Sequence, residues 1–65
     1  MHFGMTAAER AKEILAALQD SYALAEKILN LKKLTPSEPL QAAYTDIESV
    51  SVFLDAALKE SLGGR

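Results

Sequence analysis

The chain has 65 residues, a net charge of −2 and no cysteine, and its single histidine, His2, lies next to the N-terminus. Disulfides and thiolate metal sites are therefore excluded, a structural zinc site is not expected, and nothing attracts the chain generally to nucleic acid or an anionic membrane. So short a chain lies near the lower limit for folding alone, which leaves oligomerisation as a means of stabilisation. No apolar run approaches the roughly 18 residues of a membrane span and no secretory signal is visible, which predicts a cytoplasmic protein.

The first predicted helix begins after a short N-terminal tail. Residues 1–5 are expected to be disordered or left over from cloning, with Met5 as an alternative start. Thr6 and Glu9 have the spacing of a capping box, in which the threonine hydroxyl accepts the Glu9 N–H and the Glu9 carboxylate accepts the Thr6 N–H. This pattern predicts that the first helix starts here, and with it a single folded domain over residues 6–62.

The first helix is predicted over about residues 7–33, because this segment has neither glycine nor proline and is rich in strong helix formers. Lys32 and Lys33 then lie in its last turn, where the helix dipole favours positive charge, and Asn30 is an alternative end. Its apolar side chains cover an arc of about 200°, whereas one partner helix covers a stripe nearer 100°, so two neighbouring helices are expected. The arc consists of Ile14, Leu15, Ala17, Leu18, Tyr22, Leu24, Ala25, Ile28, Leu29 and Leu31.

A corner is predicted over residues 34–38, next to the two prolines of the chain. A proline inside a helix loses a backbone hydrogen bond and clashes with the preceding turn, so no helix runs through this segment. Thr35 and Glu38 again have capping-box spacing, which predicts that Thr35 caps the second helix. In that frame Pro39 falls where an N–H is needed, so a start nearer Ser37 is the alternative.

The second helix is predicted over about residues 39–62, with Gly63-Gly64 as its stop and residues 63–65 as a C-terminal tail. Val52 and Phe53 lie outside its apolar stripe, and they favour a second interface. The stripe itself consists of Leu40, Ala43, Tyr44, Ile47, Val50, Leu54, Ala57, Leu58 and Leu62.

Two local polar interactions are also predicted. Ser21 falls inside the apolar arc of the first helix, and its hydroxyl is expected to bond back to a carbonyl of its own helix. Asp55 and Lys59 are four residues apart, which predicts an ion pair on a solvated face of the second helix.

The predicted fold class is all-α, an antiparallel two-helix hairpin that dimerises into a four-helix bundle. Both helices come out near 25 residues, and a short connection favours antiparallel packing. Two hairpins side by side bury the surplus apolar arcs of both chains with two-fold symmetry. In architecture such a dimer resembles the plasmid copy-number RNA-binding protein Rop. The two share no residue motif, so the resemblance concerns fold alone, and fold does not imply function.

Catalysis, cofactor binding and metal binding are not expected. The serines of the helices have no histidine beside them, and all three glycines lie near the ends of the chain, so neither an activated nucleophile nor a phosphate-binding loop is present. Glu9 and Glu13 lie one turn apart, but they are interpreted as a capping residue and its solvated neighbour. The sequence therefore predicts a non-enzymatic protein.

The favoured function is a protein–protein interaction or regulatory module that acts as a homodimer, with a helix of a heterologous protein as a further candidate partner. Val52 and Phe53 are the residues that a heterologous partner is expected to use, because the hairpin has least use for them. The candidate interface residues are Val52, Phe53, Ile14, Leu18, Leu24, Ile28 and Leu31.

The alternative function is a Rop-like dimer that binds RNA or DNA through a helix face bearing lysines. Lys27, Lys32 and Lys33 gather near the end of the first helix, and a dimer presents them twice. The competing interpretation is that two of them favour the helix dipole and the third lies on the outer face. Nine acidic residues against seven basic ones count against a nucleic-acid partner.

Overall fold

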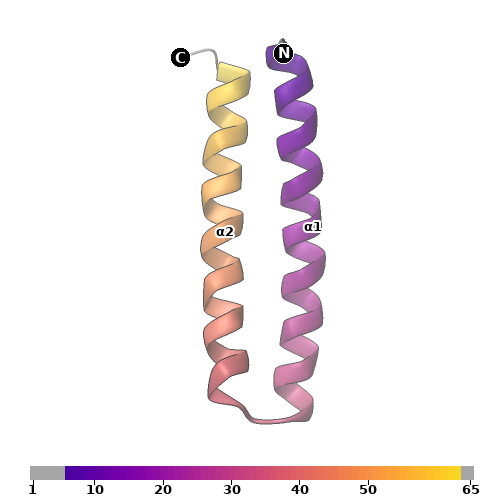
Figure 1. Cartoon of the computed structure of the whole chain (residues 1–65), viewed down its shortest axis with the longest axis vertical. Helices are drawn as coiled ribbons and strands as arrows, with labels where there is room; N and C mark the ends of the chain where they lie inside the picture. The colour runs from indigo at the N-terminus through magenta and orange to yellow at the C-terminus, as the bar shows by residue number, and fades with distance from the viewer. Residues whose placement is uncertain (1–5, 64–65) are drawn as a thin grey trace, which may run out of the picture.

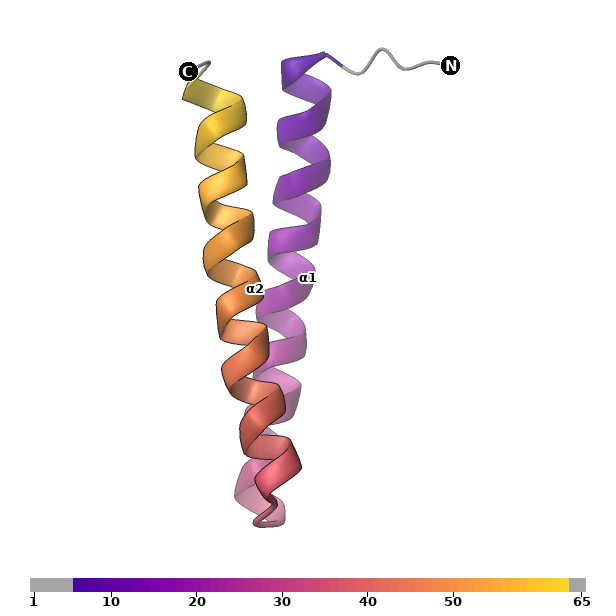
Figure 2. The same ribbon diagram turned by 60° about the vertical axis from the view of Figure 1, so that its left-hand side comes forward.

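The computed structural model describes residues 6–63, which form two long helices. Helix α1 spans Ala7–Leu34 and helix α2 spans Glu38–Gly63, with no strand within the described residues. The helices lie side by side and run in opposite directions, joined by a short loop at one end (Figure 1). In the view turned by 60°, they cross at a shallow angle (Figure 2). The predicted all-α, antiparallel hairpin is confirmed.

The capping box at the start of α1 is present as predicted. The Glu9 N–H donates to Thr6 Oγ1 at 3.1 Å, and the Thr6 N–H donates to Glu9 Oε1 at 2.9 Å. At the other end, Thr35 is the C-cap: its backbone is extended and its N–H donates to the Leu31 carbonyl at 2.9 Å. Because α1 continues through Asn30, the alternative end at that residue is wrong.

The corner differs from the prediction, because Thr35 ends α1 and does not cap α2. Helix α2 begins at Glu38, and Ser37 precedes it as the cap: Ser37 Oγ accepts the Leu40 N–H at 3.3 Å. Pro39 then lies in the first turn, where a backbone N–H has no partner within the helix. The alternative start near Ser37 is therefore correct, and the capping-box interpretation of Thr35 is wrong.

The C-terminal end of α2 also differs slightly from the prediction. Gly63 is the last helical residue and not the residue that follows the helix. Gly64 and the predicted N-terminal tail, residues 1–5, lie outside the described residues. Neither α1 nor α2, as described over residues 6–63, combines the length and apolar character needed to cross a membrane.

The helices meet along a seam of side chains spaced alternately three and four residues apart, which places them on one face of each helix. Every seam residue is buried or half-buried. Among the described apolar residues, however, only Ala11 and Leu18 are less than a tenth exposed. The seam consists of Ala11, Ile14, Leu18, Ser21, Ala25, Ile28 and Lys32 from α1, and of Leu40, Tyr44, Ile47, Ser51, Leu54, Leu58 and Ser61 from α2.

The hairpin is a single layer of two helices. Its radius of gyration is 14.9 Å, whereas a compact domain of this length has a value of about 11 Å. Its shortest dimension, 17 Å, is about one and a half times the diameter of one helix with its side chains. Stable domains pack at least two layers around a core, so both broad sides of this layer are left open.

We expect Leu18→Ala to lower the free energy of unfolding by about 2–5 kcal/mol, because Leu18 is 4% exposed and the substitution leaves a cavity in the seam. The control is Leu34→Ala at the end of α1, where an 81% exposed side chain should cost no more than about 0.5 kcal/mol. Urea denaturation followed by circular dichroism at one protein concentration measures both. Equal costs would contradict the seam described here.

Candidate functional site

The seam divides the hairpin into two broad faces. On α1, Tyr22 and Leu24 lie on opposite flanks of the seam, because they are about 200° apart around the helix. On α2, Glu48 and Val50 are likewise about 200° apart and lie on opposite flanks of the seam. Tyr22 and Glu48 line one common hollow, so they share a face, and Leu24 and Val50 share the other. We call these the groove face and the back face.

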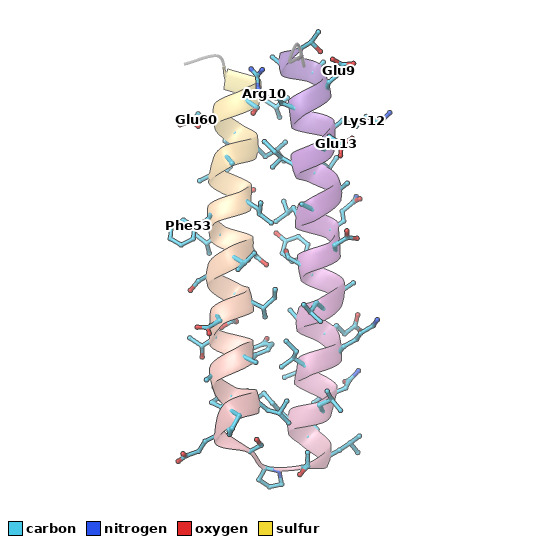
Figure 3. All side chains as sticks on the ribbon, in the orientation of Figure 1. Glu9, Arg10, Lys12, Glu13, Phe53 and Glu60 are labelled. Carbon is cyan, nitrogen blue, oxygen red and sulfur yellow. The ribbon has the colours of Figure 1, made fainter. Side chains whose placement is uncertain are left out.

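The back face is apolar at every position that flanks the seam through the middle of the hairpin. Its large side chains are 43–48% exposed, namely Leu24, Leu31 and Val50. Phe53, which is 73% exposed, lies farther around α2, beside Val52. Figure 3 shows Phe53 pointing away from α1. The back face consists of Ala17, Leu24 and Leu31 from α1, and of Ala43, Val50 and Ala57 from α2.

The groove face holds a hollow of about 430 Å³ between the two helices. Small side chains, Ala25 and Ser51, occupy the seam at its floor, and the two tyrosines stand beside them. Tyr22 is 56% exposed and Tyr44 is half-buried. The hollow, which we call the groove, is lined by Tyr22, Ala25, Tyr44, Glu48, Ser51, Val52 and Asp55.

Two buried serines meet at the centre of the seam. Ser21 Oγ lies 2.8 Å from Ser51 Oγ and 2.7 Å from the Leu18 carbonyl oxygen of its own helix. Ser51 Oγ lies 3.1 Å from the Ile47 carbonyl oxygen of α2. Each hydroxyl carries one proton, so one serine donates across the seam while the other donates to its own helix. The predicted bond of Ser21 to its own helix is confirmed, but its pairing with Ser51 was not predicted.

A cation lies over one of the tyrosine rings. Lys32 Nζ is 4.5 Å from the centre of the Tyr44 ring, within the range of a cation–π interaction. Lys32 is a seam residue in the last turn of α1, and its side chain is half-buried. This lysine is therefore part of the hairpin interface.

The acidic flank of α2 borders the groove. Asp55 Oδ2 lies 3.1 Å from Lys59 Nζ, which confirms the predicted ion pair. Both side chains are exposed enough that the pair contributes at most about 0.5 kcal/mol. Glu48, two turns before Asp55, has no ion-pair partner among the described residues.

The predicted interface residues are divided among three places. Leu24 and Leu31 lie on the back face, and Val52 and Phe53 lie on α2 beside the groove, where they line a second hollow with Glu48. The remaining three are seam residues, namely Ile14, Leu18 and Ile28. Val52 and Phe53, which sequence analysis grouped as one patch, therefore lie next to each other on α2, and only Val52 also lines the groove.

The three lysines of the alternative function do not form one patch. Lys32 lies over Tyr44 in the seam. Lys27 and Lys33 are exposed, but they are about 120° apart around α1. The three lysines therefore lie near the same end of α1 but point in different directions around the helix.

Metal binding finds no support in residues 6–63, where no group of three or more His, Cys, Asp or Glu side chains is placed to hold an ion. The Glu9 carboxylate accepts the Thr6 N–H in the capping box. Glu13 points away from α2 on the outer side of α1 (Figure 3). Their interpretation as a capping residue and its solvated neighbour fits this placement.

Comparison of the chain with protein-family models, with curated proteins and with solved structures finds no match. The candidate site therefore rests on the geometry of the hairpin. Sequence analysis missed Ser51 and the groove. The signal was present, since Ser51 continues the three- and four-residue spacing of Tyr44, Ile47, Leu54 and Leu58, but its polar side chain kept it out of the apolar stripe.

We expect Ser21→Ala and Ser51→Ala to be coupled. Each single substitution removes the bond across the seam, a net loss of about 0.5–1.5 kcal/mol that the higher helix propensity of alanine partly offsets. The double substitution leaves no hydroxyl without its partner, so it should cost less than the two single changes together, by about 0.5–1 kcal/mol. A double-mutant cycle by urea denaturation measures this difference. Simple additivity would show that the bond contributes nothing.

Proposed function

We propose that this protein is a small, non-enzymatic protein-interaction module that acts as a homodimer, in which two hairpins pack back face against back face in a four-helix bundle. The observation that carries the proposal is the shortage of burial in one hairpin: within residues 6–63 only two apolar side chains are less than a tenth exposed. A second layer would cover the back face and complete a core around the seam. A cytoplasmic location stays a prediction.

The composition of the back face supports its role in the dimer. Positions beside a coiled-coil seam usually carry charged side chains when only two helices associate. On the back face these positions recur every seven residues and are apolar on both helices. They are Ala17, Leu24 and Leu31 on α1, and Ala43, Val50 and Ala57 on α2. The alanines would let the two layers approach closely, and the larger side chains would fill the space between them. A wide apolar stripe of this kind is typical of helices in bundles.

Nucleic-acid binding has weaker support than the dimeric interaction module. Its three lysines share no face, and one of them interacts with Tyr44. In addition, α2 carries a single basic residue, Lys59, against five acidic ones, so a polyanion would be repelled along that helix. No contact or charge pattern of the described hairpin favours this second function.

We expect Val50→Asp to weaken the dimer by about 2 kcal/mol or more, because the substitution removes an apolar side chain from the back face and places a charge there. Sedimentation equilibrium over a dilution series measures the association. The matched control is Val52→Asp, which makes the same substitution two positions along α2, on the groove face. This control should associate like the unsubstituted chain.

Two results would contradict the dimer as proposed. The first is a chain that stays folded and monomeric at every concentration of the series. The second is a loss of association with Val52→Asp as large as that with Val50→Asp, which would move the interface to the groove face. Circular dichroism of each variant confirms that the helices remain intact.

A further inference from the structure

We propose that the groove binds a basic amphipathic helix of a partner protein, with one arginine or lysine side chain of that helix placed between Tyr22 and Glu48. This inference rests on the proposed role as an interaction module and names the chemistry of its partner. It does not depend on the homodimer, because the groove and the back face lie on opposite sides of the hairpin. Both surfaces can be occupied at the same time.

The shape of the groove suits a side chain that projects from a helix. The small residues Ala25 and Ser51 keep its floor low, and the tyrosines raise its walls. Its volume of about 430 Å³ is within the range of sites that hold a few side chains or a small ligand. The serine pair beneath it has its hydrogen bonds satisfied within the hairpin, so the floor needs no polar group from the ligand.

The tyrosine rings suit a cation. Tyr44 already has one, since Lys32 Nζ lies 4.5 Å from its ring centre. Across the groove, no cation from residues 6–63 lies over the Tyr22 ring, and 56% of the Tyr22 surface is exposed. A guanidinium or ammonium group that enters the groove would therefore meet an open aromatic face of the kind that the hairpin itself uses for Lys32.

The charge at the rim favours a basic partner over an acidic one. Glu48 lines the groove with an exposed carboxylate that has no ion-pair partner among the described residues. Asp55 adds a second carboxylate, shared with Lys59. Most other charges of α2 are also negative, so a basic helix would be attracted along this edge. A helix with the acidic surface of α2 would be repelled.

Exposed apolar side chains extend the groove on both helices. Val52 belongs to its lining, and Leu15 lies two turns before Tyr22 on the same flank of α1. They offer contacts to apolar side chains of the partner at intervals of three and four residues, while the basic side chain would supply orientation. This combination requires a partner that is both apolar and basic on one face, and it excludes a purely charged peptide.

The test uses the full chain and a labelled synthetic helix of about three heptads, with leucines along one stripe and arginines beside it. A twin peptide carries glutamate in place of every arginine. Fluorescence anisotropy measures binding at low and at physiological salt. We expect the arginine peptide to bind, and to bind more weakly as salt rises. The glutamate twin should bind at least about tenfold more weakly.

Three variants locate the site. Glu48→Lys and Tyr22→Ala should each weaken binding of the arginine peptide by about three- to tenfold. The control, Glu13→Lys, makes the same change of charge on the outer side of α1 and should leave the affinity within about twofold. Val50→Asp should also leave it within about twofold, because this back-face residue lies outside the groove. Binding by that variant would support the groove even if the homodimer failed its own test.

The proposal is overturned by three results. One is the absence of binding to the unsubstituted chain at low salt. Another is equal affinity for the arginine peptide and its glutamate twin, which would reduce the groove to a non-selective apolar surface. The last is a loss with Glu13→Lys as large as that with Glu48→Lys, which would reflect net charge alone. If Glu48→Lys changes the mass of the chain in sedimentation, the occupant is a second copy and the partner named here is wrong.

Discussion

Two helices packed side by side touch along one line, so each side chain of the seam has only one neighbouring helix to cover it. This constraint explains why Ala11 and Leu18 are the most buried apolar side chains of the described hairpin while Leu24, Val50 and Phe53 stay exposed. Caps and helix propensity define where the helices begin and end, but burial of apolar surface normally offsets most of the lost chain entropy. The proposed dimer follows from this shortage of burial.

The middle of the seam combines small volume with a polar pair. One of Ser21 and Ser51 donates to the other across the seam, and the other donates to its own helix, so no buried hydroxyl is left without a partner. A slip of one helix along the other would separate the two hydroxyls, and the pair therefore favours one register. The same small side chains, together with Ala25, leave the space that the groove occupies. Register and groove thus have a common origin.

The two faces of the hairpin differ in chemistry although both are partly apolar. The back face has apolar side chains beside the seam on both helices, which suits a second hairpin of the same kind. On the groove face, apolar and aromatic side chains of α1 stand opposite the acidic flank of α2, which suits a partner of the opposite charge. This division separates self-association from partner binding in a chain of only 65 residues.

The sequence by itself determined the local structure, namely the capping box of Thr6 and Glu9, two long helices and the bend between them, because these depend on residues within about one turn of each other. The sequence-based prediction was wrong at Thr35, which matches an N-cap pattern for α2 but is the C-cap of α1. Ser37 caps α2 instead, because this start places Pro39 in the first turn. Only the tertiary structure decided which flanks share a face, because that depends on contacts between residues far apart, such as Ser21 and Ser51, 30 positions apart. The groove and its chemistry arise from that pairing, which no local pattern specifies.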